Sequence, residues 1–160
     1  MGAVTKRSGA FAKGRASRGP FIAIPRAVLN SPAWAAMSGH EVKLLLDLAA
    51  SYRGNNNGDL SCAWRVMKPR GWSSRDTLAK ALAGLLDKGF IVKTRQGGKR
   101  LCNLYALSWE AIDPCDGKLD VKPWPVPSNA WRNWQPPLGA INTPGGLNKQ
   151  KIVDTVGGLH

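Results

Sequence analysis

The fold is decided by residues 61–107, which read SCAWRVMKPRGWSSRDTLAKALAGLLDKGFIVKTRQGGKRLCNLYAL. Four leucines in this stretch recur at the spacing of one helix face: Leu78, Leu82, Leu85 and Leu86. They predict an amphipathic helix over residues 74–88. The opposite face of that helix carries Asp76, Thr77, Lys80 and Gly84. Ser73 or Ser74 is suited to cap its start, and Gly89 to end it in a left-handed conformation.

Shorter elements flank this helix on both sides. Residues 61–68 predict a short helix that stops at Pro69, because proline lacks a backbone N–H and restricts the residue before it. After the long helix a strand begins, and the pair Gly97-Gly98 turns the chain back into a second strand over residues 101–107. The pattern predicts a mainly α fold with a small β-hairpin, in the α+β class.

This order of helix, glycine-containing turn, helix and basic hairpin resembles the winged helix-turn-helix family of DNA-binding domains. The residues that carry the resemblance are Ser73-Ser74-Arg75, Thr77-Leu78, Leu82, Leu85 and Lys88-Gly89-Phe90-Ile91. The resemblance covers residues 21–113 and implies one winged helix-turn-helix domain there. Ahead of it, Asn57-Gly58-Asp59-Leu60 is similar to phage- and plasmid-borne winged-helix proteins that act in replication or control of the element. A turn at Asn57-Gly58 would bring Leu60 against the wing, as in many such domains.

The net charge of +13 is concentrated in two regions. Residues 1–20 hold five basic residues and no acid, and residues 61–100 hold ten basic residues against two acids. Basic and acidic residues balance over residues 21–60 and again over residues 101–160. A concentrated excess of this kind indicates a polyanionic partner rather than solubility alone.

The resemblance also implies where double-stranded DNA would bind. Helix 74–88 would lie in the major groove, and the basic hairpin, residues 93–100, would be the wing against a minor groove or the backbone. The side chains expected to contact DNA are Arg65, Lys68, Arg70, Ser73, Ser74, Arg75, Thr77, Lys80, Lys93, Arg95, Lys99 and Arg100. Lys80 lies opposite the leucine stripe and is the first candidate for a guanine contact. Arg75 lies close to the stripe, so it reaches either a base or a phosphate. Asp76 either accepts a hydrogen bond from cytosine or complements the helix dipole.

Outside this motif the chain divides into an arm, the rest of the domain and a tail. Residues 1–20, rich in small and basic residues, predict a disordered arm that tracks phosphates or simply aids solubility. Within the domain, Ser38 and Glu41 form a capping-box pattern ahead of a helix that extends to about Tyr52. The apolar face expected for that helix is Val42, Leu45, Leu46 and Ala49.

The tail, residues 114–160, differs in composition from the domain. Seven prolines within residues 114–148 favour extended, irregular structure over helix or sheet. Three tryptophans accompany the prolines: Trp124, Trp131 and Trp134. Two interpretations stay open, because these side chains either pack back onto the domain or bind a protein partner or a second copy of the chain. Residues 139–160 are glycine-rich and predict disorder.

Catalytic, metal and cofactor sites are not expected. The cysteines, Cys62, Cys102 and Cys115, lack metal-binding spacing, and Cys62 and Cys102 lie in apolar patterns that favour the core. His40 lies in a helix cap and His160 at the end of the chain, so neither joins a catalytic set, and neither an enzyme nor a small-molecule substrate is expected. No apolar run is long enough to span a membrane and no secretory signal is present, which predicts a cytoplasmic, nucleoid-associated protein.

These features predict sequence-selective binding of double-stranded DNA by a transcriptional regulator or replication-associated factor of a mobile element. The alternatives that use the same basic surface are a plasmid or phage replication initiator, an RNA-binding protein and a protein–protein adaptor. Competition by RNA would separate the RNA-binding alternative. The basic hairpin argues against an adaptor that has lost its nucleic acid.

Overall fold

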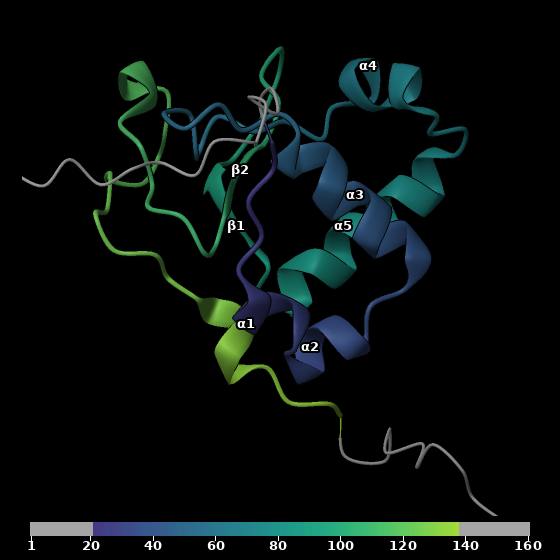
Figure 1. The fold of residues 1–160 in the computed structure, drawn as a ribbon. Helices are drawn as coiled ribbons and strands as arrows, with labels where there is room; N and C mark the ends of the chain where they lie inside the picture. Colours follow the sequence, from purple (N-terminus) through teal and green to yellow (C-terminus); the bar gives the residue numbers. More distant parts are fainter. Residues whose placement is uncertain (1–20, 138–160) are drawn as a thin grey trace, which may run out of the picture.

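Five α-helices and one antiparallel hairpin follow each other along residues 21–137, the part of the chain that the computed structural model describes (Figure 1). The helices are α1 (Arg26–Leu29), α2 (Pro32–Ala35), α3 (Gly39–Ala49), α4 (Trp64–Met67) and α5 (Arg75–Asp87). The strands are β1 (Ile91–Arg95) and β2 (Leu104–Leu107), and three 3-10 turns are η1 (Lys68–Arg70), η2 (Cys115–Gly117) and η3 (Ala130–Asn133). The predicted α+β class is confirmed, whereas the predicted arm and the glycine-rich end of the tail lie outside the described residues.

Helix α3 begins at the predicted capping box, in which Ser38 and Glu41 exchange hydrogen bonds. The expectation for its apolar face is confirmed for Leu45 and Ala49 and was wrong for Leu46. The apolar residues that it buries are Leu44, Leu45, Leu48 and Ala49, whereas Leu46 is 40% exposed. The face is rotated because Glu41, in the first turn, is itself buried and points toward α5.

Helix α5 confirms the predicted helix and its start. The Ser74 hydroxyl caps it by accepting a hydrogen bond from the backbone N–H of Thr77 at 3.2 Å. The expected outward position of Gly84 was wrong, because a Cβ there would collide with the Glu41 carboxylate of α3. That carboxylate forms a buried ion pair at 2.8 Å with Lys88, directly after α5. The missing side chain at Gly84 thus leaves room for the charge pair that joins α3 to α5.

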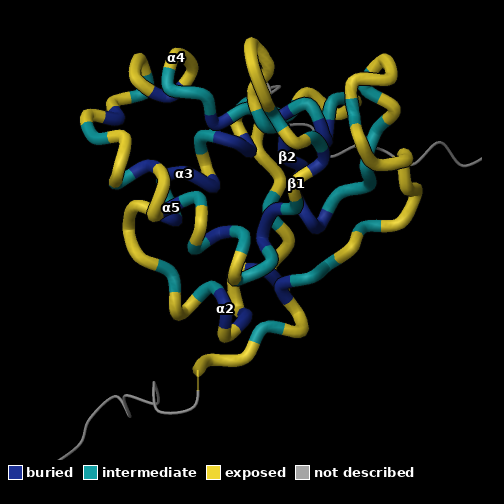
Figure 2. Tube along the Cα trace, turned by 180° about the vertical axis from the view of Figure 1, so that it is seen from behind, coloured by how far each residue is buried: buried dark blue, intermediate teal, exposed yellow. Residues whose placement is uncertain are grey.

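The core lies between the inner faces of α3, α5 and the hairpin, as the distribution of buried residues shows (Figure 2). Phe90 and Tyr105 are the largest of its fully buried side chains. Cys62 is buried as predicted, but the expectation that Cys102 belongs to the core was wrong, since its side chain is exposed. The reason is that β2 begins only at Leu104, which leaves Cys102 in the loop. Among the described helices, none has the length and apolar character needed to cross a bilayer.

The hairpin pairs Ile91 with Leu107 and is irregular beyond Lys93. Its tight turn runs from Gly98 to Leu101, which exchange backbone hydrogen bonds of 3.1 and 3.2 Å. The turn predicted at Gly97-Gly98 is therefore displaced toward the C-terminus, and the second strand starts later than expected. In the loop the Gly97 N–H donates to Oδ1 of Asn103. This side-chain contact takes the place of a backbone pair there, so the ladder between the strands does not extend to Gly97.

Leu60 forms a bridge with Tyr105, so the expected contact of this segment with the hairpin is confirmed. The bridge is held in place by Asn57, whose side chain is fully buried. Its amide nitrogen donates to the carbonyls of Leu107, Glu110 and Ala111, at 3.0, 3.2 and 2.9 Å. Its amide oxygen accepts from the backbone N–H of Leu107 at 2.7 Å. One side chain therefore ties the loop before α4 to the chain that leaves β2.

Beyond Asp113 the chain continues along the domain instead of leaving it, seen in Figure 1 as the green-to-yellow segment that descends toward α1. It first runs beside the edge of β1, where Asp120 accepts from the Gln96 N–H and donates its own N–H to Thr94 O. Further on, Trp131 is only 5% exposed, and Gly89 allows its backbone to approach closely. The described part of the tail thus packs onto the domain.

The three tail tryptophans differ in how they pack. Trp131 belongs to the core, and Trp134 lies partly buried with its indole N–H 3.2 Å from a carboxylate oxygen of Asp87. The backbone of Trp124 pairs with Ile112, but its side chain is 62% exposed. Of the two interpretations, packing onto the domain therefore holds for two of the tryptophans, and contact with a partner remains open for Trp124.

Candidate nucleic-acid interface

Helix α4 and the tip of the basic hairpin lie at the same end of the molecule in both views (Figures 1 and 2). Between them runs an open groove of about 880 Å³, which we call the α4–hairpin groove. Four basic side chains line it: Arg65 from α4, Arg95 and Arg100 from the hairpin, and Lys118 from the tail. The fold thus brings together three of the residues predicted to contact DNA and adds a fourth cation.

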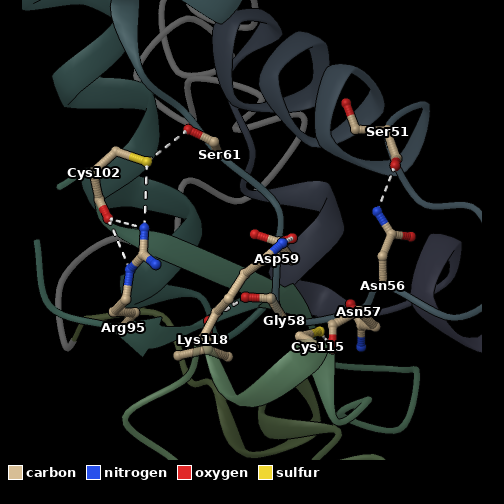
Figure 3. Close-up of polar contacts among 11 residues, drawn as sticks. Ser51, Asn56, Asn57, Gly58, Asp59, Ser61, Arg95, Cys102, Cys115 and Lys118 are labelled. Carbon is tan, nitrogen blue, oxygen red and sulfur yellow. Dashed lines mark hydrogen bonds and ion pairs between the residues drawn. The ribbon is translucent and has the colours of Figure 1, made fainter.

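Polar contacts fix the walls of this groove (Figure 3). The Arg95 guanidinium donates to the carbonyl of Cys102 across the hairpin loop, at 3.1 and 3.3 Å. At the other side the Lys118 ammonium lies 2.6 Å from Asp59, and this hydrogen bond raises the pKa of Lys118. Asp59 is the one acid among the lining residues, and the Lys118 ammonium compensates its charge.

The hairpin tip presents two exposed cations, Lys99 and Arg100, at the turn between Gly98 and Leu101. Arg100 has a φ of +69°, in the left-handed region where glycine or asparagine is usual. Such backbone strain is kept where the surrounding structure demands it, often at binding sites. The turn therefore places both residues at the end of the hairpin.

Lys80 projects from the exposed side of α5, as predicted. Its ammonium lies 2.7 Å from Asp76 one turn earlier, and both side chains are more than 70% exposed. The hydrogen bond to Asp76 raises the pKa of Lys80, so the lysine stays charged at neutral pH. An exposed pair of this kind contributes little free energy, so Lys80 can exchange Asp76 for another acceptor at small cost.

Arg75, the first residue of α5, lies with its guanidinium 5.2 Å from the centre of the Trp64 ring on α4. A cation over an indole face is attracted by the ring quadrupole. The contact turns Arg75 toward α4, the helix that carries Arg65, instead of the leucine stripe. Ser73 is exposed just before α5, and Ser74 serves as its cap.

Arg70 and Thr77 occupy different surroundings from the other predicted contacts. The Arg70 guanidinium donates to the carbonyl of Asp47 at 3.0 Å and to the hydroxyl of Ser51 at 3.1 Å, which anchors it on α3. Thr77 is half-buried in a hollow beside His40 at the start of α3. Both side chains therefore make contacts within the fold, away from the α4–hairpin groove.

Ten exposed cations within residues 21–137 form no ion pair with a carboxylate, and six of them lie on α4, η1, the start of α5 and the basic hairpin: Arg65, Lys68, Arg75, Lys93, Lys99 and Arg100. The other four, Arg26, Arg53, Lys122 and Arg132, lie apart from these elements. All six had been predicted as DNA contacts. The sequence missed Lys118, because no local pattern links it to Asp59, 59 residues earlier in the chain.

The metal-ligating and thiol side chains bear on the sequence expectations for them. Within the described ranges, histidine, cysteine and acidic side chains do not gather in groups of three that suit a metal ion. Burial, with a smaller effect from the nearby Asp47 charge, raises the pKa of the Cys62 thiol to about 12. That thiol is therefore protonated and unreactive at neutral pH.

Comparisons of this chain with protein-family models, with curated proteins and with solved structures found no match. The arguments for its function therefore come from its own residues and their arrangement.

Proposed function

We propose that this chain binds double-stranded DNA sequence-selectively as a winged helix-turn-helix protein, with α5 in the major groove and the basic hairpin as its wing. The role we propose is that of a transcriptional regulator or a replication-associated factor of a mobile element. The order α3, α4, α5, β1, β2, with Leu60 bridged to β2, is compatible with a winged helix. In that family the second helix of the motif is the one that enters the major groove.

The observation that carries this proposal is the set of six cations without carboxylate partners on α4, η1, the start of α5 and the hairpin. Cations held apart from acids attract a regularly spaced polyanion, and each phosphate that they neutralise releases counterions. Contact with about six phosphates corresponds to a log–log salt slope near −5. On the exposed side of α5, Lys80 supplies a donor suited to guanine O6 and N7.

Selection from randomised duplex DNA at near-physiological salt tests the sequence-selective part of the proposal. Wild-type protein should enrich a defined motif, and Lys80→Ala should relax that motif at one position, at a cost of about 1–3 kcal/mol there. If no motif emerges and binding disappears as salt rises, the contacts are to the backbone alone and the regulatory role is refuted. An RNA duplex that competes as well as DNA would favour the RNA-binding alternative.

A matched pair of double variants tests the surface itself. Lys99→Ala with Arg100→Ala should weaken duplex binding and reduce the magnitude of the salt slope by about 2, one for each lost phosphate contact. The control is Arg26→Ala with Arg132→Ala, two exposed arginines on α1 and η3, at the other end of the molecule (Figure 1). Fluorescence anisotropy over a salt series measures the duplex affinity and the salt slope of each double variant. An equal loss of affinity in the two variants would mean that net charge, not this surface, governs binding.

A further inference from the structure

The α4–hairpin groove has apolar surface between its cations. Val66 on α4 is 40% exposed and Leu101 on the hairpin is 59% exposed, and both line the groove from opposite sides. Ala63 and Leu104 add to the same lining. Large apolar side chains are costly to leave in water, and here they lie in a concave, basic setting. The lining therefore suits a ligand with both flat apolar parts and negative charge.

Three of the four cations in the groove are arginines: Arg65, Arg95 and Arg100. A guanidinium grips phosphate oxygens through two parallel donors and also stacks on the face of a nucleobase, which the ammonium of lysine does poorly. Because Lys118 already compensates Asp59, the groove keeps a net positive charge. The chemistry matches phosphates joined to unpaired bases.

The size of the groove favours a single strand. Its volume of about 880 Å³ lies near the upper end of the range for sites that enclose small ligands, about 300–1,000 Å³. A groove of this size has room for a few unpaired nucleotides. Arg100 at the tip of the basic hairpin lines the groove, so a strand that leaves a duplex bound at the hairpin starts next to it.

We propose that the α4–hairpin groove binds unpaired nucleotides of a DNA strand adjacent to the bound duplex. Their bases pack on Val66 and Leu101, and their phosphates pair with the groove arginines. This inference rests on the proposed duplex binding and extends it to junctions between paired and unpaired DNA. Such a site favours the replication-associated role over that of a regulator, because opened duplex arises where a strand is copied.

The test compares fluorescently labelled DNA by anisotropy with the full chain. One probe is a blunt duplex, and others carry a short oligo-thymidine tail at the 3′ or the 5′ end. A tail at one end should tighten binding about tenfold relative to the blunt duplex, the change that 1.4 kcal/mol produces. A tail of abasic units keeps the phosphates but removes the bases, so it should recover only part of the gain. A blunt duplex lengthened by the same number of phosphates controls for added charge.

Val66→Ser with Leu101→Ser should abolish the gain from the tail and leave binding of the blunt duplex unchanged. The matched control is Leu29→Ser with Val126→Ser, whose side chains are 40% and 60% exposed elsewhere on the domain. This control should keep the gain. Thermal melting verifies that both variants are folded.

Each outcome decides between the proposals. Equal binding of tailed and blunt probes overturns the groove site and leaves duplex binding intact. A gain that survives in the groove variant also overturns it, since the tail then binds elsewhere. Binding of tails alone, without duplex, supports the groove and overturns the proposed function, and absence of binding to every probe overturns both. An acidic amphipathic peptide could also bind the wild-type protein without displacing a DNA tail. If its binding were lost in the groove variant, the groove would be assigned to a protein partner instead.

Discussion

Replacing Asn57 tests whether one buried amide holds the hairpin to the rest of the domain. Asn57→Ala leaves the Leu107 N–H without its acceptor and deprives three carbonyls, those of Leu107, Glu110 and Ala111, of a donor. An unsatisfied buried polar group costs about 1–3 kcal/mol. The Leu107 carbonyl also accepts from the Glu110 N–H at 3.4 Å, so it is partly compensated. We expect a loss of about 3 kcal/mol in the free energy of unfolding, a large part of what a domain of this size has.

Urea denaturation followed by circular dichroism measures this loss, with thermal melting as a second readout. A loss of about 3 kcal/mol should lower the Tm by roughly 10 °C or more. The control is Asn55→Ala, an exposed asparagine in the same loop, whose effect should stay within about 0.5 kcal/mol. If the two variants unfold at the same denaturant concentration, the amide contacts do not stabilise the fold and the reasoning is refuted.

Asn57→Asp sharpens the same test through pH. The carboxylate would face carbonyl oxygens in a buried site, which raises its folded pKa above the unfolded value, about 3.9. Above the unfolded pKa the charge therefore costs stability, and the cost declines as pH falls and the acid regains a donor. Relative to wild type, the variant should be more destabilised at pH 7 than at pH 4. A difference from wild type that does not change with pH would contradict this account.

Two further predictions concern the contact between α3 and α5. Burial alone would raise the pKa of Glu41, but the hydrogen bonds from Lys88 and Ser38 outweigh it and lower the pKa below 4.5. The pair therefore stabilises the protein above that pH and ceases to do so as pH falls through the folded pKa. Lys88→Met should lower the free energy of unfolding by about 3 kcal/mol at pH 7, measured by denaturation. At pH 3 its difference from wild type should be smaller. A difference that is the same at both pH values would refute the role of the ion pair. Gly84→Ala should destabilise because its Cβ meets the Glu41 carboxylate, whereas Gly39→Ala, which meets nothing within 4 Å, should stabilise by up to about 1 kcal/mol; equal effects would contradict the packing.

Elements whose signals are local could be predicted from the sequence. The α5 helix follows from its leucine spacing and its Ser74 cap, and the capping box at Ser38 needs only four consecutive residues. The exposed position of Lys80 follows from the same helical phase. Such features depend on neighbours within one or two turns, which the sequence displays directly.

Features set by distant contacts could not be predicted. The contact of Arg70 with Asp47, 23 residues earlier in the chain, has no local signal. The face of α3 was shifted by a buried acid whose partner, Lys88, lies 47 residues away. The hairpin turn moved because Asn103 takes the Gly97 N–H. In each case a polar side chain satisfied by a remote partner outweighed the local pattern.

The position of Asn57 before Gly58 has a consequence for chemical ageing. Asn-Gly pairs deamidate readily in flexible chains, because the glycine nitrogen attacks the side-chain carbonyl carbon and ammonia leaves. In the folded protein that side chain is fully buried and fixed by its hydrogen bonds, so it cannot take up the geometry for attack. Each excursion to the unfolded state removes this protection. If the side chain becomes aspartate there, refolding would bury its negative charge among carbonyl oxygens, which is unfavourable. Damage in the unfolded chain therefore becomes an irreversible loss of folded protein.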